Sequence, residues 1–516
     1  MNGFGLHSLA LVIWLTVMAA LALLYMTVPP SPDQSQFDWM AFIATQGQPF
    51  YKGSFDMNWP GAMWLHEAGI RLFGVHAWTW RLTDFLLMAG FTVAGALFLS
   101  RAGWQVAPLI FLFLYPPLYI TAGGWMAGQR DIIATGFLLG ACALAIPGRR
   151  REGIAVVTAG LFVAAAVLIR PTFLSFIVGL ILLEALPLKL HYSHTQRLGH
   201  TRRAIGFAAG LTTGVGAAVA AGFVLGNLDD WYQQSIKFSL SVYAGDPPQD
   251  WRITLNTLFV SSWHWITILA LVGFGLWARR DKFGYALILA IGVAVTSAVS
   301  FAVQNKGFGY HLGGVLPVLV LFASVALDGL EQLRRTTVSY IGSMVVFLAL
   351  SLAGLLALTG TAAKLMNLKD GAQLLVSGKL GPTEGYGLTE KERREIIAMI
   401  KEGSTATDTV AIYGTNYELA YRAKRLPTYR FFTPAADQIT SRFRYHEDWL
   451  SEIESALETR APAFVIIRRS AIKESAVNPV PAFPNRPILG RLVMHLYEGY
   501  EIAFKNAHVI VYRKAP

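Results

Sequence analysis

Apolar residues in this chain fall into long blocks that are separated by short polar segments. Most blocks have close to the ~20 residues that an α-helix needs to cross a ~30 Å hydrocarbon layer. The pattern therefore predicts a polytopic α-helical membrane protein with about eleven spans. We expect these spans at residues 8–28, 79–100, 104–122, 131–147, 153–170, 172–187, 204–226, 260–278, 283–302, 311–330 and 337–360.

Three of the spans have features of their own. The run from Leu9 to Val28 is longer than a signal-peptide core and has no charged leader, so we interpret it as an uncleaved first helix. Only Pro171 separates spans 153–170 and 172–187, so this pair is either two full spans or a re-entrant hairpin. Span 204–226 is rich in glycine, which lets neighbouring backbones approach, so we expect it inside the bundle.

Two long loops, 29–78 and 227–259, contain amphipathic stretches. In the first loop one stretch places Phe37, Met40, Ala41 and Ala44 on one helical face. Such segments predict helices that lie in the membrane interface rather than across it. A channel or carrier needs no such structure, whereas an enzyme that works at the membrane surface does.

The pattern changes after the last span. Residues 389–402 read as a capped amphipathic helix, and strands are expected at 409–413, 463–468 and 507–513, with helices near 416–423 and at 445–459. This alternation predicts a small α/β domain with a partly parallel sheet over residues 361–516, after a membrane module over residues 1–360. The domain has neither GxGxxG nor GxxxxGK[ST], so nucleotide binding has no motif support.

Composition and charge agree with the membrane class and give an orientation. Hydrophobic residues make up 54% of the chain and charged residues only 15%, well below the ~25% of soluble domains. Much of the net charge of +11 lies in short loops, as in Arg149–Arg150–Arg151 and Arg279–Arg280, which predicts a cytoplasmic N-terminus and an extracytoplasmic C-terminal domain. No basic stripe points to nucleic acid, and the single Cys142 excludes an intramolecular disulfide.

Two aspartates of the first outward loop are candidates for chemistry. Asp33, directly after the first span, is either a general base above the membrane, or an N-cap or solvated loop residue of the first interfacial helix. Asp56, close to Pro60, either hydrogen-bonds a substrate or organises the turn.

Two further segments place ionisable groups at the outer ends of spans, where charge is costly and usually functional. Gln129, Arg130 and Asp131 lie in the outward loop that leads into the fourth span. There they either suit a polar headgroup or a metal, or form a local ion pair with Asp131 favoured by the helix dipole. The outer start of the tenth span has Lys306, Tyr310 and His311, and the outer end of the fifth span has Arg170. Together these donors could bind a lipid phosphate. The alternative is that Lys306 and Tyr310 snorkel to the interface.

The order of these features carries a resemblance. An aspartate follows the first helix, and the run Gly47-Gln48-Pro49-Phe50-Tyr51 precedes Phe55-Asp56 and Pro60. A second acidic residue, Asp131, heads a later helix, a Tyr/His loop precedes a helix with Pro317, and an outward α/β segment ends the chain. Over nearly its whole length the chain resembles a GT-C superfamily glycosyltransferase of the branch with the protein O-mannosyltransferases and the lipid A aminoarabinose transferases.

The resemblance implies a transferase that uses a polyprenyl-phosphate sugar donor at the outer face of a bacterial inner membrane, with a lipid, glycan or protein as acceptor. Asp33 would be the general base of an inverting transfer, and Arg130, Arg170, Lys306 and His311 would stabilise the departing phosphate. Many members have Asp-Glu where this chain has Asp33-Gln34. The departure leaves no cofactor certain and a divalent metal open.

Other functions compete with this one. A flippase for lipid-linked saccharides would also need basic groups, but no inverted repeat is detectable. An O-antigen polymerase or ligase characteristically depends on a large mid-chain loop and does not usually end in an α/β domain of this size. An assembly subunit with a degenerate site is a third alternative, because a glutamine follows Asp33.

Overall fold

The computed structural model describes residues 3–26, 28, 30–146, 152–185, 194–245, 250, 252, 263–281, 284–304, 306–336, 388–433, 435–439, 443–474, 479–483, 485–496 and 499–515. The chain divides into two compact units. Unit 1 comprises Met1–Tyr25, Asp84–Ala218 and Pro247–Lys369, and unit 2 comprises Met26–Thr83, Val219–Asp246 and Asp370–Pro516.

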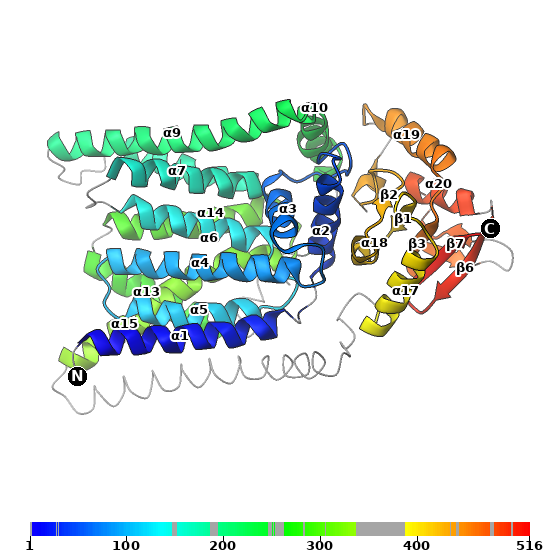
Figure 1. Ribbon diagram of the computed structural model, residues 1–516. Helices are drawn as coiled ribbons and strands as arrows, with labels where there is room; N and C mark the ends of the chain where they lie inside the picture. The colour runs from blue at the N-terminus through cyan, green and yellow to red at the C-terminus, as the bar shows by residue number, and fades with distance from the viewer. Residues whose placement is uncertain are drawn as a thin grey trace. The chain divides into compact units, whose positions relative to one another are not determined.

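Unit 1 is a set of long apolar helices that lie side by side (Figure 1). Among the described residues, four helices are long and apolar enough to cross a membrane by the combined test of length and hydropathy. The chain is thus an integral multi-pass membrane protein, as predicted, and the expected span 337–360 lies outside the described residues. The helices are α1 (Gly3–Tyr25), α4 (Thr79–Arg101), α5 (Ala107–Thr121), α6 (Arg130–Ala145), α7 (Glu152–Ile169), α8 (Leu174–Ala185), α9 (His194–Val224), α13 (His264–Asp281), α14 (Tyr285–Gln304) and α15 (Leu316–Thr336).

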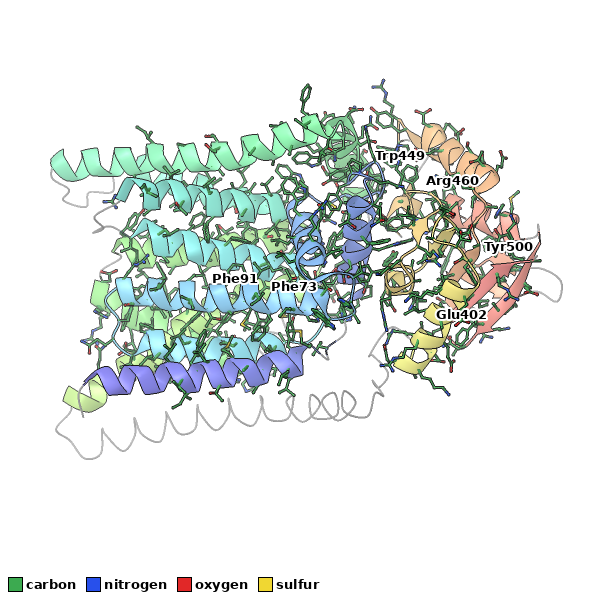
Figure 2. The ribbon with its side chains drawn as sticks, viewed as in Figure 1. Phe73, Phe91, Glu402, Trp449, Arg460 and Tyr500 are labelled. Carbon is green, nitrogen blue, oxygen red and sulfur yellow. The ribbon has the colours of Figure 1, made fainter. Side chains whose placement is uncertain are left out.

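Close helix contacts in unit 1 depend on small residues. The ring of Phe91 on α4 (Figure 2) lies where a Cβ on Gly136 of α6 would be, 2.2 Å from the nearest ring atom. On α9, a Cβ on Gly210 would lie 2.0 Å from the carbonyl oxygen of Val157, so α7 and α9 touch through their backbones. The expectation that span 204–226 packs inside the bundle was wrong, because only 17% of an 18-residue stretch within Arg203–Val224 is buried. Gly210 and Gly214 of α9 face α7, whereas a Cβ on Gly216 would meet nothing within 4 Å.

Two buried carboxylates join helices of unit 1. Asp84 accepts hydrogen bonds from the hydroxyls of Tyr25 and Tyr119. Asp328 of α15 accepts from the backbone N–H groups of Gln105, Val106 and Ala107, at 2.9 to 3.0 Å. The N–H groups at a helix start have no partner within the helix, so Asp328 caps α5 from another helix.

Unit 2 contains the C-terminal sheet together with the helices of the two long loops. The sheet has the strand order β2-β1-β3-β7-β6, in which β2, β1 and β3 are parallel and β3, β7 and β6 are antiparallel. The predicted α/β fold with a partly parallel sheet is therefore confirmed. Its strands are β1 (Thr409–Tyr413), β2 (Leu426–Pro427), β3 (Phe464–Arg468), β6 (Tyr500–Lys505) and β7 (Val509–Lys514), with a separate pair β4 (Ile472–Glu474) and β5 (Pro479–Pro481).

The helices of unit 2 come from three parts of the chain. The two long loops form α2 (Pro32–Thr45) and α3 (Gly61–Phe73), and α10 (Leu228–Trp231), η2 (Tyr232–Phe238, a π-helix) and α11 (Ser239–Ser241). The C-terminal region adds α17 (Glu390–Glu402), α18 (Tyr417–Ala423), α19 (His446–Thr459) and α20 (Pro487–Leu496).

An aromatic cluster forms the core where these parts meet within unit 2. Trp449 of α19 (Figure 2) packs against Phe431 and Phe443, with ring centroids 4.9 Å apart in each case. The same ring lies 5.3 Å from Phe55 of the first loop and 5.9 Å from Phe238 of η2. Rings at these distances contribute both burial and favourable edge-to-face contacts. The C-terminal sheet and the two loops thus share one hydrophobic core.

One buried carboxylate, Asp437, joins the sheet to α20. Its Oδ2 accepts a hydrogen bond from the Tyr413 hydroxyl at 2.6 Å, and its Oδ1 accepts from the N–H of Ile488 at 2.7 Å. Burial raises the pKa of Asp437 to about 6, against the effect of these hydrogen bonds.

Candidate active site

Ser31 and Gln34 form the start of α2, and they leave Asp33 out of the cap. The Ser31 hydroxyl accepts from the N–H of Gln34, and the Gln34 side chain accepts from the N–H of Ser31 at 2.9 Å. This is a capping box, in which glutamine serves as well as glutamate. The N-cap alternative for Asp33 is therefore wrong. The structure thus gives Gln34 a structural role in the cap of α2.

Asp33 lies on the accessible strip of α2. In the first three turns of this helix only Asp33 and Gln36 are not fully buried. Because they are three residues apart, their side chains lie on the same face. Gln36 donates to Asp56 Oδ2 at 2.8 Å. The two predicted aspartates are therefore held close to each other within unit 2.

Asp56 organises the loop in which it lies. Its Oδ1 accepts from both the backbone and side-chain nitrogens of Asn58, at 2.6 Å each. Its own N–H donates to Gln234 of η2 at 3.1 Å. These hydrogen bonds agree with the alternative in which Asp56 organises the turn. A contact of Asp56 with substrate stays a prediction.

Tyr417, at the start of α18, is a residue of this region that the sequence did not reveal. It is buried, and its ring stacks on Trp39 of α2 with centroids 6.1 Å apart. Its hydroxyl has no hydrogen-bond partner among the described residues. Burial raises the pKa of Tyr417 well above its usual value, and the charges of Asp33 and Asp56 raise it further. The hydroxyl thus stays protonated and can donate close to both carboxylates.

A second carboxylate on α2, Asp38, belongs to the packing of unit 2. It accepts from Nδ1 of His66 on α3 at 2.7 Å. The His66 ring stacks on Trp80, with ring centroids 3.4 Å apart. Burial lowers the pKa of His66 despite the nearby Asp38. This buried pair fixes α3 against α2.

In unit 1, Asp131 and Arg170 form the centre of a buried polar network. Arg170 Nε lies 2.9 Å from Asp131 Oδ1, and Arg170 Nη2 lies 2.9 Å from Asp131 Oδ2. Gln304 and Ser300 of α14 also donate to Asp131 Oδ1, at 3.1 and 3.3 Å. The local pairing of Asp131 with its neighbour Arg130 was the alternative, but the partner in the structure is Arg170. The network ties the ends of α6, α7 and α14 together.

Further donors neighbour this network in the sequence: Gln129 and Arg130 directly precede Asp131, and Lys306 follows Gln304 by two residues. Gln129, Arg130, Lys306 and His311 are all buried, at 2 to 8% exposure. His311 lies within electrostatic range of Asp131, Arg170 and Arg130, and its Nδ1 has no hydrogen-bond partner among the described residues. With histidine counted as neutral, Arg130, Arg170 and Lys306 against Asp131 leave a net charge of +2. Such a group of donors suits a phosphate anion.

Aromatic rings border the same group of residues. The ring of Tyr310 stacks on Trp125 at 5.6 Å and on Phe308 at 5.5 Å between centroids. Gly307 has a φ of +63°, a conformation that glycine adopts without strain. A Cβ on Gly314 would lie 3.1 Å from the Asp131 carbonyl oxygen, so the turn before α15 packs directly on α6. Tyr310 is thus held by its contacts with Trp125 and Phe308, and Lys306 is buried.

The donor set for a metal ion is not assembled in the described part of the chain. No group of three or more His, Cys, Asp or Glu side chains is placed to hold one there. Both oxygens of Asp56 already accept hydrogen bonds, and Gln34 is engaged in the cap.

Comparison with solved structures shows the fold. The chain is similar to ArnT from Cupriavidus metallidurans bound to undecaprenyl phosphate, with a TM-score of 0.63, 14% identity and 97% of each chain covered. The apo state of that protein matches with a TM-score of 0.60, 12% identity and the same coverage. The chain is also similar to the oligosaccharyltransferase AglB from Archaeoglobus fulgidus in complex with an inhibitory peptide and a dolichol-phosphate. For that structure the TM-score is 0.50 and the identity 12%, and the match covers 89% of this chain and 69% of that chain.

These likenesses confirm the GT-C-like fold that the sequence motifs suggested. No protein-family model and no curated protein sequence matches the chain. These proteins therefore share the overall fold of the chain, at a level of identity where only the fold can be compared.

Proposed function

We propose that the protein is an integral membrane glycosyltransferase that moves a sugar from a polyprenyl-phosphate donor to a hydroxyl acceptor. The observation that carries the proposal is the buried group of cations and donors around the Asp131–Arg170 pair. Buried charge in a membrane domain is costly and is kept for a function. The fold supports it, because solved structures of similar fold hold undecaprenyl phosphate or a dolichol-phosphate.

In this proposal Arg130, Lys306 and His311 bind the donor phosphate, with Tyr310 and Gln129 as further hydrogen-bond donors. Arg170 is held by Asp131, so its role is to position the network and to add positive charge. A leaving phosphate carries up to about two negative charges. The net charge of +2 matches that anion and stabilises the charge that develops as the sugar departs.

Asp33 is the proposed general base, and Asp56 helps hold its surroundings. The acceptor oxygen forms a bond to the anomeric carbon while the bond from that carbon to the phosphate oxygen breaks. The acceptor proton passes to the Asp33 carboxylate, and the bonding electrons leave with the polyprenyl phosphate. Attack opposite the leaving group inverts the anomeric configuration.

In the proposed orientation the reaction takes place on the outer side of the membrane. With the arginine-rich loops in the cytoplasm, the N-terminus is cytoplasmic and the C-terminal sheet lies outside, in the periplasm if the membrane is a bacterial inner membrane. The acceptor is a glycan, a lipid or a protein with a free hydroxyl.

The test is sugar transfer from a radiolabelled polyprenyl-phosphate sugar in proteoliposomes. Asp33→Asn is expected to abolish transfer while donor binding persists. The matched control is Asp448→Asn, since Asp448 is also an aspartate in the first turn of a helix and is exposed. Retained turnover in Asp33→Asn would overturn the role of the base.

The same assay separates the alternatives. Sugar transfer with release of the polyprenyl phosphate supports the proposal. Movement of the intact donor across the bilayer without cleavage would instead identify a flippase, and neither activity would point to an assembly subunit.

A further inference from the structure

Unit 1 contains a cavity of about 460 Å³ that the proposed reaction does not use. Its volume is within the ~300–1,000 Å³ range of small-molecule sites. The cavity is bounded by helices α6, α7, α8, α9 and α14, and almost all of its wall is apolar, including Ala141, Phe176, Phe207, Ala208 and Leu289.

Small side chains on two facing helices leave this space. Ala204, Ala208 and Leu211 lie one helical turn apart and so line the same face of α9. Across the cavity, Ala141 and Ala145 occupy the same face of α6. Ala204 and Ala208 are exposed, so the cavity is open to the surroundings of the helices, which in a membrane are lipid chains.

Among the described residues, one cation borders this apolar space. Arg203 of α9 lines the cavity, and its guanidinium carbon lies 5.8 Å from the centroid of the Tyr285 ring, which also lines it. The cavity lies by the C-terminal end of α6 and the N-terminal ends of α7 and α14, where the sequence has its arginine-rich loops. An apolar chain and an anionic headgroup would each find a complementary surface there.

The cavity is separate from the proposed donor site. Arg130 begins α6, whereas Ala141 and Ala145 lie near the other end of that helix, roughly 17 to 22 Å away at 1.5 Å per residue. The same holds for α14, in which Tyr285 is the first residue and Gln304 the last. A headgroup at Arg203 therefore does not compete for the cations around Asp131.

We propose that this cavity binds one anionic phospholipid, with an acyl chain between α6 and α9 and the headgroup phosphate at Arg203. The inference does not depend on the glycosyltransferase proposal. Bound lipid would fill the space beside α9, the helix that contacts α7 through Gly210 and is otherwise largely exposed.

The test is native mass spectrometry of the purified full-length protein with phosphatidylglycerol or phosphatidylcholine. Phosphatidylglycerol should bind more tightly than phosphatidylcholine. Arg203→Gln should lower the affinity for phosphatidylglycerol about fivefold, which corresponds to the ~1 kcal/mol typical of one basic residue near an anionic headgroup. Arg279→Gln is the matched control, because Arg279 is exposed in the last turn of α13 and does not line the cavity.

Filling the cavity tests the acyl-chain half of the proposal. Ala208→Trp should reduce binding of both lipids, and Ala204→Leu serves the same purpose if the tryptophan variant does not fold. Equal phosphatidylglycerol affinity in wild type and Arg203→Gln, unchanged binding in the filled variants, or displacement of phosphatidylglycerol by polyprenyl phosphate would each overturn the assignment.

Discussion

Arg170 and Asp131 meet in a two-point ion pair, with both nitrogen-to-oxygen distances at 2.9 Å and both side chains buried. Arginine suits this geometry because its planar guanidinium matches the two oxygens of a carboxylate. Arg170 ends the α7 region and Asp131 begins α6, so the pair joins two helix ends. Arg170, which the sequence suggested as a ligand of a lipid phosphate, is thus the ion-pair partner of Asp131 in the structure.

Breaking this pair should destabilise the protein. Asp131→Asn leaves a buried guanidinium without its countercharge, at an expected cost of about 3–5 kcal/mol. The double variant Asp131→Asn with Arg170→Gln should recover much of that loss, since it removes both charges. Chemical unfolding of the four proteins in a double-mutant cycle measures the coupling, and additive effects would contradict the pairing.

The capping box at Ser31 gives a second prediction. Ser31→Ala should cost about 1 kcal/mol, because the N–H of Gln34 loses its acceptor. Gln34→Glu should leave both stability and transfer nearly unchanged, since glutamate serves equally in the cap. The measurement is the thermal midpoint with the transfer rate beside it. A gain of metal-dependent activity in Gln34→Glu would show that this position does more than cap α2.

Much of the fold follows from the sequence because apolar block length is a strong physical signal. Span 79–100 was observed as Thr79–Arg101, and span 283–302 as Tyr285–Gln304. The strand expected at 409–413 was observed as Thr409–Tyr413, because a short apolar run between turns is also a clear signal. By contrast β2, two residues long, and β6, in which half of the residues are exposed and none is buried, carry no such signal.

The contacts of the candidate site could be predicted less well. Periodicity places Asp131 and Arg170 at helix ends, but which cation pairs with Asp131 depends on how α6 and α7 cross. The proximity of Tyr417 to Asp33 depends on packing between segments nearly 400 residues apart in sequence. No local pattern encodes such a contact; only the stacking of Tyr417 on Trp39 in the folded chain reveals it.

Tyr417 gives a third prediction. Tyr417→Phe keeps the ring on Trp39 and removes only a hydroxyl without a partner among the described residues, so the thermal midpoint should hardly change. If that hydroxyl donates to Asp33 or to bound acceptor, kcat/KM for transfer should fall about tenfold, as expected for a hydrogen bond to a charged group. Tyr429→Phe is the matched control, since Tyr429 is also buried with an unpartnered hydroxyl in the described structure. Equal losses in both variants would argue against a specific role.

The raised pKa of Asp437 predicts a pH dependence of stability in unit 2. Its pKa is about 6 in the folded protein, against ~3.9 in an unfolded chain. The folded state therefore favours the protonated form. This stabilising contribution is fully present below pH ~3.9 and is lost as the pH rises through about 6.

Asp437→Asn, which cannot ionise, should be more stable than wild type at pH 7.5, and the difference should shrink towards pH 4. Thermal midpoints of both proteins across this range measure it, with Asp448→Asn as the control because Asp448 is exposed. A difference between wild type and Asp437→Asn that stays constant over the range would show that the Asp437 carboxyl does not titrate near pH 6.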